Sequence, residues 1–97
     1  MKYFDRAFQK QLLQMMAETY PCTVSQTVLD DMLLLAGCEH KLAANLVYLE
    51  EKQLSYSGLQ PTSDGSFLFN CKEIRITHKG LDLLADDGDV FSAILNS

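Results

Sequence analysis

The stretch AANLVYLEEKQLSYSGLQ, residues 43–60, decides the fold, because its pattern of apolar residues changes part-way along. Leu42, Leu46 and Leu49 are spaced as on one face of a helix. From Leu54 onward, apolar and polar residues alternate, which is the spacing of a strand. Residues 52–54 therefore form a junction at which a helix runs directly into a strand.

Two further helices are predicted before this stretch. Their apolar stripes are Phe8, Leu12 and Met15 in the first, and Val28, Met32 and Leu35 in the second. Asp5 is a suitable cap for the first helix, and Pro21 forbids its continuation. Thr23 or Ser25 can cap the second helix, and Gly37 suits its C-terminal end.

A hairpin and a fourth helix are predicted after the junction. The turn cluster PTSDGS, residues 61–66, contains an Asp-Gly pair that favours a tight hairpin. In the return limb, Phe67 and Phe69 have the opposite parity to Ile74 and Ile76, so both pairs cannot face one core from an unbroken strand. We therefore predict a bulge or break within residues 70–72. Thr77 is expected to cap the fourth helix.

The resulting order is helix, helix, helix, strand, turn, strand, helix. It predicts a mainly α protein with a β-hairpin, an α+β fold of the winged helix-turn-helix type, with residues 1–97 as one domain. Residues 89–97 carry four apolar side chains that either close the core or form a homodimer interface, and we favour the dimer. These four are Val90, Phe91, Ile94 and Leu95.

Two motifs carry a family resemblance. LVYLEEKQL, residues 46–54, resembles the end of the third helix in bacterial winged-helix transcriptional regulators, and IRITHKGLDLL, residues 74–84, resembles their strand exit and following helix. Over roughly residues 10–90 the chain is similar to short winged-helix proteins of proteobacteria and their prophages. The family usually has glycine where this chain has Gln53, so we expect Gln53 to adopt a left-handed conformation.

The resemblance implies a dimeric, DNA-binding transcriptional regulator. Burying the leucine stripe is expected to turn five third-helix residues toward the major groove, namely His40, Lys41, Ala44, Asn45 and Tyr48. Among them, Asn45 can bond adenine and Lys41 guanine or phosphate. Ser63 and Ser66 of the hairpin are expected to lie along the DNA backbone.

The charge distribution supports a different function. The chain has a net charge of −5, whereas affinity for phosphates comes from Lys and Arg. The third helix contains no arginine, and Glu39, Glu50 and Glu51 outweigh Lys41 and Lys52. The alternative is therefore a winged-helix protein–protein interaction module or prophage adaptor that does not bind DNA.

Other classes of function find no support in the sequence. No nucleophile–base arrangement or glycine-rich phosphate loop is present, so we predict that the protein is not an enzyme and uses no cofactor. The adjacent acids Glu50 and Glu51 diverge by about 100° on a helix and are expected only to aid solubility. The three cysteines are widely spaced, so we expect them reduced, mostly buried and not bound to metal. With no signal peptide or membrane span recognised, we expect a cytoplasmic protein without a membrane partner.

Overall fold

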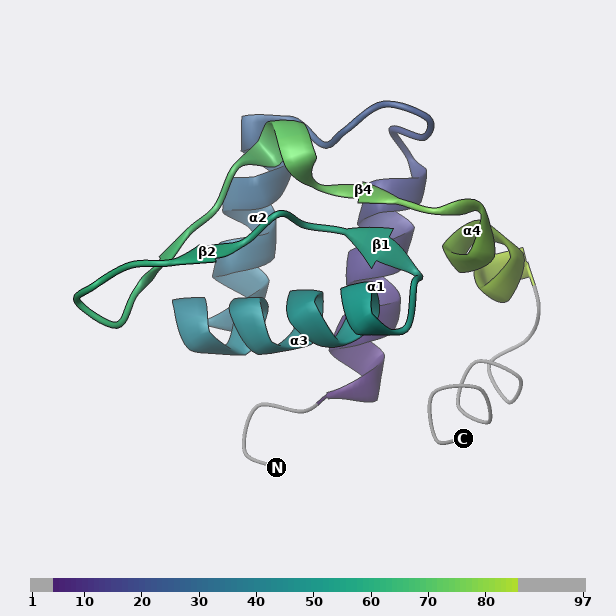
Figure 1. The fold of residues 1–97 in the computed structure, drawn as a ribbon. Coiled ribbons are helices and arrows are strands. Elements are labelled where there is room, and N and C mark those ends of the chain that lie inside the picture. The colour runs from purple at the N-terminus through teal and green to yellow at the C-terminus, as the bar shows by residue number, and fades with distance from the viewer. Residues whose placement is uncertain (1–4, 86–97) are drawn as a thin grey trace.

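The computed structural model describes residues 5–85 (Figure 1). This part of the chain is mainly helical, with two short antiparallel strand pairs, which confirms the predicted α+β class. No helix in it is long and apolar enough to cross a membrane. The elements are α1 (Arg6–Ala17), α2 (Gln26–Ala36), α3 (Glu39–Glu51), β1 (Ser55–Tyr56), β2 (Gln60–Pro61), β3 (Phe67–Leu68), η1 (Cys71–Glu73), β4 (Arg75–Ile76) and α4 (His78–Ala85).

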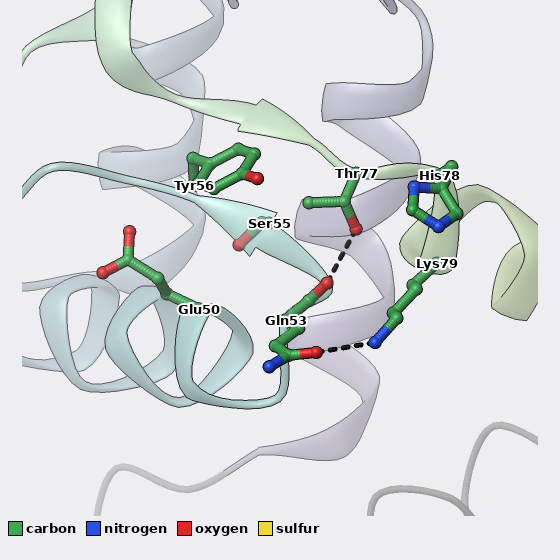
Figure 2. A pocket seen from close by; sticks show the side chains of 7 residues that line it. All are labelled: Glu50, Gln53, Ser55, Tyr56, Thr77, His78 and Lys79. Carbon is green, nitrogen blue, oxygen red and sulfur yellow. Dashed lines mark hydrogen bonds between the residues drawn. The ribbon is translucent and has the colours of Figure 1, made fainter.

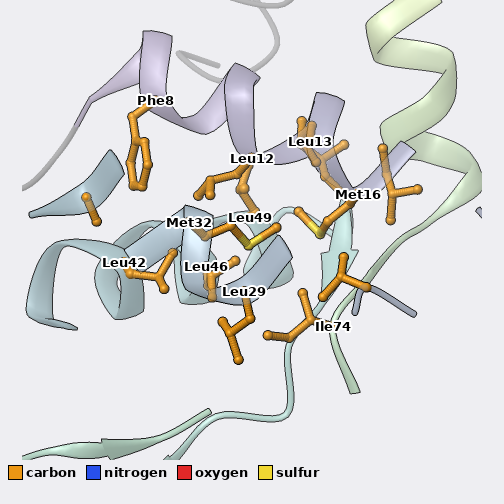
Figure 3. Close-up of a cluster of buried hydrophobic side chains, with 14 of the residues drawn as sticks. Phe8, Leu12, Leu13, Met16, Leu29, Met32, Leu42, Leu46, Leu49 and Ile74 are labelled. Carbon is orange, nitrogen blue, oxygen red and sulfur yellow. The ribbon is translucent and has the colours of Figure 1, made fainter. Parts of the chain in front are cut away.

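One apolar core lies between α1, α2, α3 and β4 (Figure 3). The leucine stripe predicted for α3 is completely buried there. In α1, Phe8 and Leu12 are buried as predicted, but Met16 is fully buried and Met15 lies only at the edge of the core. In α2, Leu29 and Met32 are buried but Leu35 is 50% exposed, so its predicted place in the stripe was wrong. α2 contacts the core along a face too narrow to include Leu35.

The predicted helix ends are confirmed. The Asp5 carboxylate accepts a hydrogen bond from the Phe8 amide at 3.0 Å, and Ser25, rather than Thr23, caps α2. Gly37 ends α2 with a φ of 84°, which is left-handed backbone that favours glycine. Gln53 ends α3 with a φ of 63°, as predicted from the missing glycine.

The strands pair in two short ladders. β1 pairs with β4 beside the helices, and β2 pairs with β3 in the hairpin that extends away from them (Figure 1). Between β3 and β4 the chain forms the η1 turn, capped by Asn70, which confirms the predicted break. The hairpin and α4 lie at opposite ends of the helical core (Figure 1).

Glu50 fixes the chain where it leaves β1, so the expectation that it only aids solubility was wrong. Its Oε1 accepts hydrogen bonds from the Ser57 amide at 2.7 Å, the Ser57 hydroxyl at 3.2 Å and the Gly58 amide at 3.4 Å. Acidic side chains near a helix end commonly stay in water, but here a carboxylate satisfies the donors of the turn that follows β1. Glu50 thereby joins the end of α3 to the segment that leads from β1 into the hairpin.

The cysteines differ from expectation. Cys22 and Cys38 are exposed and Cys71 is partly exposed, so the prediction that they are mostly buried was wrong. Cys22 lies in the loop after α1, and Cys38 is the residue before the first turn of α3. Both stand in connections rather than on packed faces, and connections run over the surface.

Two serine side chains, one in β1 and one directly after it, are buried. Ser55 and Ser57 are buried, at 1% and 0% exposure, while Tyr56 is 51% exposed. Ser57 is hydrogen-bonded to Glu50, whereas the Ser55 hydroxyl has no hydrogen-bond partner within residues 5–85. An unsatisfied buried hydroxyl lowers stability, because it loses its bonds to water and gains none.

Ser55→Ala is therefore expected to raise the free energy of unfolding by about 1 kcal/mol, measured by urea denaturation. The matched control is Ser57→Ala, which removes a bonded hydroxyl and should lower the same quantity by about 1 kcal/mol. Equal destabilisation by both variants would show that the Ser55 hydroxyl is satisfied in solution.

Candidate functional site

The five third-helix residues predicted to contact DNA lie on two different faces of α3. Lys41, Asn45 and Tyr48 recur at i, i+4 and i+7, and each contacts a side chain at the start of α1 or just before it. His40 and Ala44 lie on an exposed face of the helix. The five residues are therefore divided between a face that packs against α1 and an exposed face.

Asn45 is buried, with 1% exposure, so the expectation that it points outward was wrong. Its Oδ1 accepts a hydrogen bond from Gln9 Nε2 at 2.8 Å, and its Nδ2 donates to the Lys41 carbonyl oxygen at 2.7 Å. Gln9 is also completely buried, and its Oε1 accepts a hydrogen bond from Arg6 Nη1 at 3.2 Å, so the polar atoms of both buried amides are hydrogen-bonded. The buried face of α3 is wider than its leucine stripe because α1 packs beside that stripe. In this conformation the buried Asn45 side chain cannot contact adenine as predicted.

Lys41 and Tyr48 lie on either side of Asn45. Lys41 Nζ is 3.3 Å from the Asp5 carboxylate and 5.1 Å from the centroid of the Phe8 ring. The guanidinium of Arg6 lies 5.5 Å from the centroid of the Tyr48 ring. Both side chains therefore contact residues at the start of α1 or just before it. The Phe8 amide, and secondarily Lys41, hold the pKa of Asp5 below its usual value.

The exposed face of α3 is a stripe at i, i+4, i+7 and i+11. It consists of His40, Ala44, Val47 and Glu51. None of these is Lys, Arg, Asn or Gln, the side chains that most often read bases. Val47 was not among the predicted site residues, although its place seven residues after His40 on the same face could have identified it.

An apolar groove lies beside this stripe. It has a volume of about 260 Å³ and is lined by His40, Ala43, Ala44, Val47 and Phe67. The His40 and Phe67 rings meet edge to face, with centroids 5.6 Å apart. Phe67 belongs to β3, so the hairpin forms one wall of the groove and α3 the other. The sequence predicts Phe67 on the return limb of the hairpin, but its contact with His40 at the start of α3 depends on tertiary packing.

The tip of the hairpin is acidic. Ser63 is exposed there, while Ser66 donates a hydrogen bond from its hydroxyl to the Asp64 carboxylate at 2.8 Å. The Thr62 hydroxyl also donates to Asp64. Hydrogen bonds, the largest effect from Thr62 and the next from Ser66, lower the pKa of Asp64 to about 2. The two serines predicted to follow the DNA backbone thus flank a carboxylate that is ionised at neutral pH and repels phosphate.

Two further expectations concern other parts of the chain. The predicted dimer residues, Val90, Phe91, Ile94 and Leu95, lie outside the described residues. Within residues 5–85, no three His, Cys, Asp or Glu side chains come close enough together to hold a metal ion.

Asn45→Ala is expected to lower the free energy of unfolding by about 2 kcal/mol, because it leaves the Gln9 amide buried without its partner. Urea denaturation monitored by circular dichroism measures this change. Ala44→Ser, one position away on the exposed face, is the control and should change stability little. An Asn45→Ala protein as stable as wild type would refute a structural role for the buried amide pair.

Asp5→Ala is expected to lower the free energy of unfolding by about 1 kcal/mol at neutral pH, through loss of the helix cap. The folded-state pKa of Asp5 is lowered, so the stability due to its charge is present above the ordinary value of 3.8 and is lost as pH falls below it. The difference in the free energy of unfolding between wild type and Asp5→Ala should therefore become smaller as the pH is lowered. Denaturation curves across pH measure it, with Asp31→Ala, an exposed carboxylate of α2, as the control. A difference independent of pH would contradict this account.

Comparison with known proteins gives no relative from which to assign the site. No family model, no curated protein and no solved structure matches this chain.

Proposed function

We propose that this chain is a winged helix-turn-helix module that binds a protein partner through the exposed stripe of α3 and the β2–β3 hairpin. The observation that carries the proposal is the division of α3 into two faces. The side chains suited to DNA are directed at α1 or buried, whereas the exposed face and Phe67 enclose an apolar groove. Such a groove binds apolar side chains and offers little to a phosphate backbone.

The chemistry around the groove indicates the kind of partner. Glu39 and Glu51 are exposed at the two ends of α3, Asp64 is ionised at the hairpin tip, and the chain has a net charge of −5. A partner that inserts one or two apolar side chains flanked by Lys or Arg complements this surface. The volume of about 260 Å³ suits a few side chains rather than a whole helix.

A DNA-binding regulator, dimeric through residues 90, 91, 94 and 95, is the second candidate. The specific observation in its favour is the short connection from α2 to α3 at Gly37 and Cys38, followed by a hairpin after α3. This order supports a helix-turn-helix, and the resemblance of residues 46–54 and 74–84 to bacterial regulators agrees with it. Lys72, exposed in the η1 turn, is one cation near the hairpin that a phosphate could meet.

Val47→Asp tests the first candidate, because it places a charge in the apolar groove without removing a buried side chain: Val47 is already 39% exposed. A photoreactive phenylalanine derivative at Ala44 identifies the partner in cells, with the same group at the exposed Gln14 of α1 as the control position. The purified partner should bind Val47→Asp at least about tenfold more weakly than wild type in calorimetry. A partner that cross-links equally from Gln14, or binds both proteins equally, contradicts the proposal.

Fluorescence anisotropy with a pool of random duplex DNA separates the two candidates. The first predicts no binding at low or physiological salt. Binding that falls steeply as salt rises would establish phosphate contacts and support the regulator instead. In that case Lys41→Ala should weaken binding to every sequence, as expected for a phosphate contact.

A further inference from the structure

A second cavity lies at the other end of α3, where that helix meets β1 and the start of α4 (Figure 2). Its volume is about 400 Å³, which suits a small molecule. Unlike the groove beside Phe67, it is lined mainly by polar side chains. These are Glu50, Gln53, Ser55, Tyr56, Thr77, His78 and Lys79.

The wall of this cavity contains the unsatisfied hydroxyl of Ser55. Ser55 is 1% exposed, and its Oγ has no hydrogen-bond partner within residues 5–85. Figure 2 shows the hydroxyl directed toward the side on which Glu50 and Gln53 lie. Buried polar groups are nearly always hydrogen-bonded, so the unpaired hydroxyl of a residue that lines the cavity would gain a partner from a ligand bound beside it.

One end of the cavity is positively charged. α4 begins there, capped by Thr77, whose hydroxyl accepts a hydrogen bond from the Gly80 amide at 3.2 Å. The first amides of a helix have no intrahelical acceptor, and the helix dipole adds partial positive charge. Lys79 contributes a full charge, and its Nζ donates to Gln53 Oε1 at 2.6 Å. A carboxylate is the group that this end would bind.

The other end is negatively charged. All three hydrogen bonds that hold the Glu50 carboxylate go to Oε1, and Oε2 accepts none from residues 5–85. In Figure 2, Glu50 and Lys79 lie at opposite sides of the cavity, with Ser55 and Gln53 between them. A simple anion would meet repulsion from Glu50, and a simple cation would meet it from Lys79. Charge complementarity therefore favours a ligand that carries both charges.

We propose that this cavity binds a small zwitterion, with its carboxylate at the start of α4 and its ammonium group at Glu50. The Ser55 hydroxyl bonds the ligand between these two ends. The chemical class is an amino acid or a related amino-carboxylate. This site is separate from the groove of the proposed function, because the two cavities share no lining residue.

The test is a titration of the ¹⁵N-labelled full chain, followed by amide chemical shifts. The zwitterionic probes are glycine, β-alanine, γ-aminobutyrate and ε-aminocaproate, which place the two charges at increasing separations. Butyrate and butylammonium are the singly charged controls. At least one zwitterion should give saturable shifts at Ser55, Tyr56 and residues 77–79, and bind about tenfold more tightly than either control. No saturable shift with any zwitterion, or equal binding of a control, overturns the proposal.

Three variants then locate the site. Glu50→Gln keeps an oxygen acceptor for Ser57 and Gly58 but removes the charge. Lys79→Met removes the opposite charge, and Ser55→Ala removes the unpaired hydroxyl. Each variant should lower the affinity for the tightest-binding zwitterion by about tenfold or abolish its binding. Lys72→Met, which replaces an exposed lysine outside the cavity, should leave that affinity unchanged. The dispersion of the amide spectrum verifies that each variant is folded. Undiminished binding in both Glu50→Gln and Lys79→Met overturns the assignment.

Discussion

The hydrogen bond between Gln9 and Asn45 fixes how α1 lies against α3, and the rest of the molecule depends on that placement. Both amides are buried among leucines, where an unpaired amide would cost more than most single apolar contacts contribute. Sliding or rotating one helix against the other would break the pair, so it selects one arrangement among those that leucine packing alone would permit. The polar side of α3 is thereby turned toward α1, and the stripe of His40, Ala44, Val47 and Glu51 remains exposed.

The hairpin is positioned by a second polar contact of α3. Glu50 holds the turn after β1 through Ser57 and Gly58, and this directs the chain so that Phe67 meets His40 at the opposite end of the helix. The carboxylate that holds the start of this segment thus lies almost three turns along α3 from His40, which lines the groove. Replacing Glu50 by a side chain without an acceptor would change the hairpin direction and the groove together, which is why the Gln variant is the informative one for the cavity.

Features set by local chemistry could be predicted from the sequence. The caps at Asp5, Ser25 and Thr77 and the break after Asn70 depend on neighbouring residues alone. The left-handed Gln53 was expected from the resemblance to a family that has glycine at that position. Features that depend on tertiary packing could not be predicted from the sequence. Asn45 has the spacing of a solvent-facing residue relative to the leucines, but the approach of α1 buries it. Leu35 has the spacing of a core residue, but it is 50% exposed. The candidate site is defined by such packing. Two of the five predicted α3 residues line the groove, and Phe67 reaches it from a different element.

The groove and the polar cavity are both built on α3, a single helix of 13 residues. His40 and Val47 line the groove, whereas Glu50 and, just after the helix, Gln53 line the cavity. Gln53 also accepts hydrogen bonds from Thr77 and Lys79, so the end of α3 is joined directly to the start of α4. A ligand that bonds Glu50 and Lys79 would add a second link between the same two elements. Any resulting shift of α3 would reach His40 through the rigid helix. Thermodynamic linkage makes such an effect reciprocal: a ligand that changes the partner's affinity by some factor has its own affinity changed by the same factor when the partner is bound.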